Sequence, residues 1–147
     1  MDVLVNNPAF KTYALCSAIL ALKMILSAVY TAVTRARRAG YVNPEDAATF
    51  GKGATAAEVE RPAVAHALRI QRNDLENIPA FFAIGLIYVL LGASPFGAAV
   101  YLWTFTIARV LHTLVYMGHL QPWRAITYFV GVACMIGMIA QIIARAW

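Results

Sequence analysis

The feature that most constrains this chain is the length of its apolar segments. Four largely apolar stretches, each of about 20 residues or more, are separated by three connections. A hydrocarbon core roughly 30 Å thick needs about 20 apolar residues of helix to cross it. With 61% hydrophobic and 13% charged residues, the chain carries too little charge for a water-soluble protein of this size. The sequence therefore predicts an all-α integral membrane protein with a bundle of four transmembrane helices.

The chain has room for a single domain, spanning residues 1–147. The two later connections are short, and loops of that length join antiparallel neighbours. The long first connection, about 36–61, contains Asn43 followed by Pro44, which predicts an N-cap and the first residue of a helical turn. The four long helices are expected at about 10–35, 62–91, 96–117 and 124–145.

Lysine and arginine residues gather on one side of the predicted membrane. The opposite side has little beyond Lys11 and Arg145. By the positive-inside rule, the long connection lies in the cytosol and both termini lie across the membrane, which is the inner membrane in a bacterium or the endoplasmic reticulum in a eukaryote. No recognition motif accompanies the net charge of +5, so a nucleic-acid partner is not expected. The basic residues on the cytosolic side are Arg35, Arg37, Arg38, Lys52, Arg61 and Arg124.

Polar residues form a stripe along the second predicted helix. Charges inside a spanning helix cost at least ~2.5–3.5 kcal/mol each near the bilayer centre, so they mark functional positions by default. The stripe has the spacing i, i+3, i+4 and i+7, which places its members on one helix face. Polar positions on the third and fourth helices lie toward the same cytosolic end. The stripe consists of Arg69, Arg72, Asn73 and Glu76, and the other positions are Arg109, His112, Tyr116, Arg124 and Tyr128.

Two interpretations of these polar positions remain open. They could pair with one another and hold the helices together. However, four arginines face Glu76 and at most one further carboxylate, Asp74, which leaves uncompensated positive charge. A partly buried positive site favours an anionic ligand. Lys23, alone on the first helix, is predicted to have a structural role, either by extending to the interface or by pairing with a neighbour's carboxylate.

Other site chemistries lack the necessary patterns. His66, His112 and His119 have no HExxH or equivalent ligand spacing, and nearby arginines would repel a cation, so no metal site is predicted. No serine lies in a G-x-S-x-G motif. Cys16 and Cys134 each sit in an apolar run outside any CxxC pair and receive no role.

Several motifs in one order resemble the membrane-associated eicosanoid and glutathione metabolism (MAPEG) family, over nearly the whole chain. This resemblance implies a homotrimer of four-helix subunits that hold glutathione between neighbouring subunits near the cytosolic face. The motifs are Asn43-Pro44-Glu45-Asp46, Phe50-Gly51-Lys52-Gly53, Val59-Glu60-Arg61, Arg72-Asn73-Asp74-Leu75-Glu76-Asn77-Ile78, Arg109-x-x-His112-Thr113-x-x-Tyr116 and Arg124.

The resemblance also implies which residues bind glutathione as co-substrate. Arg35 and Arg72 suit its two carboxylates and Glu76 its ammonium. Arg124 is the expected catalytic group, which stabilises the thiolate, with the Tyr128 hydroxyl as a second donor to the sulfur. Arg69 and Arg109, from the polar stripes, complete the predicted set. The residues that the resemblance implies are Arg35, Arg72, Asn73, Glu76, His112, Tyr116, Arg124 and Tyr128.

The expected activity is that of a membrane-bound glutathione transferase acting on hydrophobic electrophiles, with glutathione peroxidase activity toward lipid hydroperoxides as a further option. A glutathione-dependent prostaglandin E synthase is the alternative within the family. That branch has a serine and a threonine where this sequence has Ala125 and Phe129, whereas Arg124-Ala125 looks more like the microsomal glutathione transferases. Outside the enzymes, a non-catalytic scaffold that binds a lipid or a membrane protein, or a small transporter, remains open.

Overall fold

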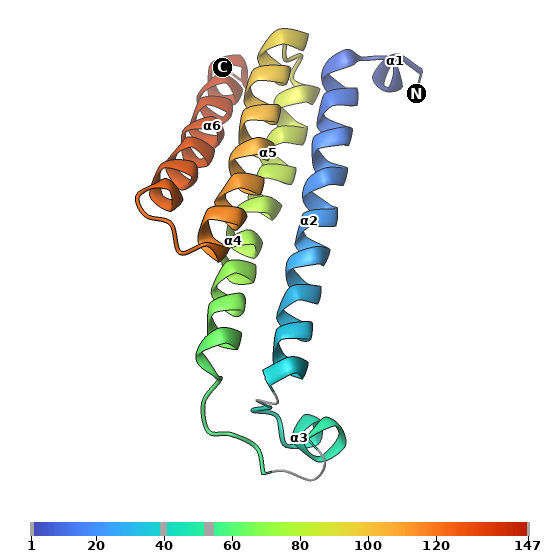
Figure 1. Ribbon diagram of the computed structural model, residues 1–147. Coiled ribbons are helices and arrows are strands. Elements are labelled where there is room, and N and C mark those ends of the chain that lie inside the picture. The colour runs from blue at the N-terminus through green and yellow to red at the C-terminus, as the bar shows by residue number, and fades with distance from the viewer. Residues whose placement is uncertain (1, 39–40, 52–54, 147) are drawn as a thin grey trace. The chain divides into compact units, whose positions relative to one another are not determined.

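The computed structural model describes residues 2–38, 41–51 and 55–146 (Figure 1). All regular secondary structure in these ranges is helical, which confirms the all-α prediction. Lys52 and Gly53, part of one family motif, lie outside the described residues. The helices are α1 (Asp2–Val5), α2 (Pro8–Arg38), α3 (Pro44–Phe50), α4 (Pro62–Leu90), α5 (Pro95–Met117) and α6 (Trp123–Ala146).

Three of these helices, α2, α5 and α6, are long and apolar enough to cross a membrane. The prediction of a multi-pass integral membrane protein is therefore confirmed, with three of the four expected spans. Helix α4 is 29 residues long, but its first half carries the charged residues of the polar stripe. Its expected crossing of the membrane stays a prediction.

Local signals in the sequence define where the shorter helices begin. Helix α3 starts at Asn43 and Pro44 as predicted, although the Asn43 side chain donates to Asp46 Oδ2 at 3.2 Å instead of capping the helix. Helix α5 starts at Ser94, whose Oγ accepts from the Gly97 backbone N–H at 3.1 Å. A serine or asparagine before a proline favours a helix start, because proline lacks a backbone N–H and the N–H groups of the first turn have no partner within the helix.

The described chain forms two compact units, one of Met1–Lys23 with Asp74–Trp147 and one of Met24–Asn73. In the first unit, α5 and α6 lie side by side and antiparallel, joined by a short connection (Figure 1). Its core contains Leu20, Tyr88 and Leu102, all fully buried, and the stacked rings of Phe81 and Phe105, whose centroids lie 4.3 Å apart. This packing connects α4 to α5 about one turn before the polar positions of α5, which begin at Arg109.

A close approach of α5 and α6 depends on Gly137. A Cβ atom at that position would come within 2.5 Å of the Tyr101 ring, so a larger side chain must displace the tyrosine. We expect Gly137→Leu to destabilise the protein by about 1–3 kcal/mol and to lower its melting temperature in detergent by several degrees. Ala133→Leu, at an exposed position of α6, is the matched control. An unchanged melting temperature for Gly137→Leu would contradict the close approach, and Tyr101→Ala should partly rescue it.

Candidate functional site

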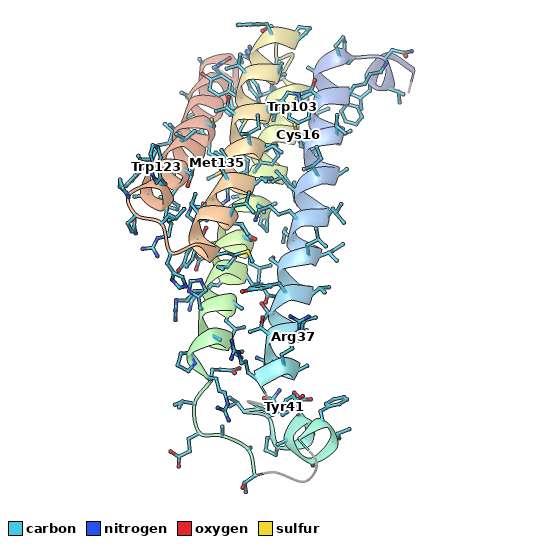
Figure 2. All side chains as sticks on the ribbon, in the orientation of Figure 1. Cys16, Arg37, Tyr41, Trp103, Trp123 and Met135 are labelled. Atoms are coloured by element: carbon cyan, nitrogen blue, oxygen red, sulfur yellow. The ribbon has the colours of Figure 1, made fainter. Side chains whose placement is uncertain are left out.

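His112 connects α5 to the start of α6. This residue is 3% exposed, and its Nδ1 lies 3.1 Å from the Arg124 carbonyl oxygen and 3.2 Å from Thr127 Oγ1. Because a carbonyl oxygen can only accept, we infer the tautomer in which Nδ1 carries the proton. Thr127 Oγ1 in turn donates to the carbonyl oxygen of Trp123, which Figure 2 shows at the start of α6. The first turn of α6 is therefore fixed against α5.

Arg124 lies among polar and aromatic side chains at this junction. Its guanidinium carbon lies 4.7 Å from the centroid of the Tyr116 ring, a cation–π geometry. With the Gln121 amide oriented to satisfy both groups, its oxygen accepts from Arg124 Nη2 at 2.6 Å and Nε at 3.0 Å. The His112 ring lies 5.7 Å from that of Tyr116 and 6.3 Å from that of Tyr128, between centroids. The structure thus brings together four predicted site residues: His112, Tyr116, Arg124 and Tyr128.

About one turn before His112 on α5, Arg109 belongs to a buried ion cluster whose centre is Asp74. The Asp74 side chain is 1% exposed, and its Oδ1 lies 2.6 Å from Lys23 Nζ and 3.2 Å from Arg109 Nη2. The predicted structural role of Lys23 is confirmed by this pairing with a carboxylate of α4. Asp74, which was expected as at most one further carboxylate facing the four arginines, pairs with one of them, Arg109, and also with Lys23. The i, i+3 spacing of Arg109 and His112 did not reveal that the two side chains have different partners.

The cluster connects three helices through charge. Lys23 belongs to α2, Asp74 to α4 and Arg109 to α5, and all three lie within the first compact unit. Buried charges are tolerated when they are paired, because an isolated charge in an apolar surround loses its hydration without compensation. The arrangement therefore favours a structural role for Arg109, whose side chain is 1% exposed.

In the second unit, Arg35 forms an ion pair that sequence reasoning missed. Its Nη2 lies 2.6 Å from Oε1 of Glu60, a residue just before the start of α4. Glu60 appeared in the sequence only as part of a family motif, and no periodicity connects it to Arg35. Arg35 also lines a cavity of about 260 Å³ with Tyr41, Phe50 and others. Figure 2 shows Tyr41 next to α3, and its ring centroid lies 6.2 Å from that of Phe50.

The polar stripe of α4 lies on the exposed face of that helix. Arg69, Arg72 and Glu76 are exposed and Asn73 is half-buried, while the opposite face buries apolar residues such as Val64 and Ile70. Arg35, Arg69, Arg72 and Asn73 belong to the second unit, and the other six predicted ligands belong to the first. The complete ten-residue site stays a prediction.

Candidate metal ligands are scattered in the part of the chain that the structure describes. No three His, Cys, Asp or Glu side chains come together there as a metal site requires. Cys16 and Cys134 are both buried free thiols. The chemistry available at the α5–α6 junction is that of a guanidinium, two phenols and an imidazole.

The long apolar helices define a membrane protein. Residues 13–144 match the sequence model of the MAPEG family, and the chain belongs to that family. The resemblance seen in the motifs is confirmed. Human (Homo sapiens) prostaglandin E synthase is 36% identical over 146 residues, which cover 99% of this chain and 95% of that protein. Human microsomal glutathione S-transferase 1 is 38% identical over 136 residues, covering 90% of this chain and 88% of that protein. The bovine (Bos taurus) microsomal glutathione S-transferase 1 is 36% identical over 141 residues, which cover 94% of this chain and 91% of that protein.

Proposed function

We propose that this protein is a membrane-bound glutathione transferase that stabilises the glutathione thiolate for attack on hydrophobic electrophiles. The observation that carries the proposal is the junction of α5 and α6, where Arg124 lies with His112, Tyr116 and Tyr128. Membership of a family that includes microsomal glutathione S-transferase 1 supports the same conclusion. Glutathione is then the co-substrate, and the second substrate is an apolar electrophile drawn from the membrane.

The proposed binding residues match the charges of glutathione. Arg35 and Arg72 bind its carboxylates, and Glu76 binds its ammonium. Asn73 and Tyr116 hydrogen-bond its amides, with Arg69 adding positive charge nearby. His112 donates its Nδ1 proton to the backbone, which leaves Nε2 as an acceptor for a ligand N–H. Arg109 is assigned to the buried ion cluster instead of the ligand.

Arg124 is proposed to supply the charge that makes the thiol reactive. A free thiol has a pKa near 8.5 and is only a few per cent ionised at pH 7. Bringing it to half thiolate needs a shift of roughly 1.5 units, or about 2 kcal/mol, which one nearby guanidinium can supply. Tyr128 donates a second hydrogen bond to the sulfur. The thiol proton passes to water, the sulfur forms a bond to the electrophilic carbon, and the leaving group departs with its electron pair.

The assembly is proposed to be a homotrimer of four-span subunits with the site on the cytosolic side, in the endoplasmic reticulum or the bacterial inner membrane. Membership of the MAPEG family, the resemblance to which implies such a trimer, supports this arrangement.

Glutathione binding and turnover provide the direct test. Calorimetry in detergent is expected to give a binding heat with glutathione, and 1-chloro-2,4-dinitrobenzene is expected to be conjugated to it. A lipid hydroperoxide tested beside it reports any peroxidase activity. If glutathione gives no heat and neither substrate turns over, the protein is a scaffold that has lost the site, and the proposal fails.

Prostaglandin E synthase activity is a second candidate because the human enzyme of that name aligns with 99% of this chain. Ala125 and Phe129, both exposed at the start of α6, depart from the serine and threonine expected for that activity. A prostaglandin endoperoxide assayed in parallel separates the two candidates. Isomerisation of the endoperoxide without conjugation of the aromatic halide would favour the synthase and contradict the transferase proposal.

A further inference from the structure

The ion pair between Arg35 and Glu60 uses only part of the hydrogen-bonding capacity of its two side chains. Nη2 of Arg35 donates to Oε1 of Glu60 at 2.6 Å. Within the described residues, Arg35 Nε and Glu60 Oε2 are both buried and have no hydrogen-bond partner. A guanidinium and a carboxylate can form two parallel bonds, but this pair presents one donor and one acceptor without partners. Such atoms are costly when buried, so a ligand that satisfies both would bind favourably.

The surroundings of Arg35 offer room for a small ligand group. The cavity of about 260 Å³ that Arg35 lines is bounded by side chains of the last turns of α2, of Tyr41 and of α3. Asp46 and Phe50 of α3 also line it, and the Asp46 carboxylate accepts a hydrogen bond from the Asn43 side-chain amide. The whole arrangement, including Glu60, belongs to the second compact unit.

The two unpartnered atoms require a ligand that has an acceptor and an N–H on neighbouring atoms. Both ends of glutathione meet this requirement: the γ-glutamyl end has a carboxylate and an ammonium, and the glycyl end has a carboxylate and an amide N–H. The γ-glutamyl end suits Arg72 and Glu76, which stand at i and i+4 on α4. The glycyl end is therefore the one that remains for Arg35 and Glu60.

Building on the proposed glutathione site, we infer that Glu60 is a further binding residue that recognises the glycyl end of the tripeptide. Glu60 Oε2 accepts the glycyl amide N–H, and Arg35 Nε donates to the glycyl carboxylate. The existing Nη2–Oε1 bond keeps the guanidinium in position for this contact. Glu60 acts on binding and not on the sulfur, so its loss should raise KM for glutathione and leave kcat at saturation unchanged.

Truncated ligands provide the test, by calorimetry with the full-length protein in detergent. For the wild type, γ-glutamylcysteine, which lacks glycine, is expected to bind at least tenfold more weakly than glutathione. In Glu60→Ala this preference should shrink by about tenfold, the contribution of one hydrogen bond to a charged group. Glu60→Gln keeps an amide oxygen as acceptor, so its preference for glutathione should lie between those of the wild type and Glu60→Ala. Glu58→Ala, at an exposed acid two residues earlier, should behave like the wild type.

The outcomes separate this inference from the function on which it rests. If the wild type binds glutathione but Glu60→Ala and Glu60→Gln both retain the full preference over γ-glutamylcysteine, Glu60 is not a ligand. Cysteinylglycine, which lacks the γ-glutamyl end, is the second truncated ligand. If Glu60→Ala loses preference for glutathione over cysteinylglycine instead, Arg35 and Glu60 bind the γ-glutamyl end and the assignment is wrong. Absence of any glutathione heat in the wild type would count against the proposed function itself. Melting temperatures of the variants identify any that lose affinity because they do not fold.

Discussion

Replacing Arg124 by alanine is expected to abolish the thiolate signal of bound glutathione and to lower kcat by about a hundredfold or more. With the guanidinium gone, the pKa of the bound thiol should return toward about 8.5 and the thiol should be largely protonated at pH 7. The thiolate absorbs in the ultraviolet, so the difference spectrum on adding saturating glutathione measures its amount directly. Arg124 is half-buried and held by Tyr116, so its loss should leave the helices in place.

Two further variants make this result specific. Arg124→Lys keeps the positive charge without the planar guanidinium, and it should retain part of the thiolate signal. Arg37→Ala removes an arginine from the last turn of α2, at an exposed position labelled in Figure 2, and should change nothing. A thiolate signal of unchanged size in Arg124→Ala would show that another group activates the sulfur.

Removing the carboxylate of Asp74 is expected to cause the largest loss of stability. Asp74→Asn leaves the charges of Lys23 and Arg109 buried without a counter-charge, and breaking a buried pair in this way costs about 3–5 kcal/mol. A large fall in melting temperature, or failure to recover folded protein, should follow. Circular dichroism during heating in detergent measures the effect.

The matched control and a compensating variant test the cause of that loss. Glu45→Gln removes a carboxylate charge from the exposed surface of α3 and should have little effect. Replacing the whole cluster, with Lys23→Met, Asp74→Leu and Arg109→Met together, should recover much of the stability, because no buried charge remains unpaired. If Asp74→Asn unfolds at the same temperature as the wild type, the cluster does not hold the helices together.

Apolar run length and helical spacing were sufficient to predict much of this protein. Runs of about 20 apolar residues predicted the segments that form α2, α5 and α6. The spacing of His112 and Tyr116 on α5, with the short connection before Arg124, predicted that these side chains meet. A tight antiparallel connection leaves the facing ends of two helices few alternative positions, which is why the proximity of these side chains could be predicted from the sequence.

Other features depend on which helix covers which face, and spacing along one helix does not contain that information. Asp74 is next to Asn73 in the sequence, yet it lies on the buried face of α4 with Lys23 and Arg109 as its partners. Arg109 shares the periodicity of His112 but is 1% exposed and paired with that carboxylate. The contact of Arg35 with Glu60 joins residues 25 positions apart across a loop, where no periodic pattern applies.

The ion cluster also has a consequence for how the chain enters the bilayer during synthesis. Lys23 emerges from the ribosome 51 residues before the carboxylate that neutralises it, and Arg109 emerges 35 residues after. Helix α2 must therefore be accommodated with an unmatched ammonium until α4 has been made, and Arg109 of α5 then joins a carboxylate that already has a partner. The three helices are therefore expected to associate cooperatively, since Lys23, Asp74 and Arg109 meet only when α2, α4 and α5 are together.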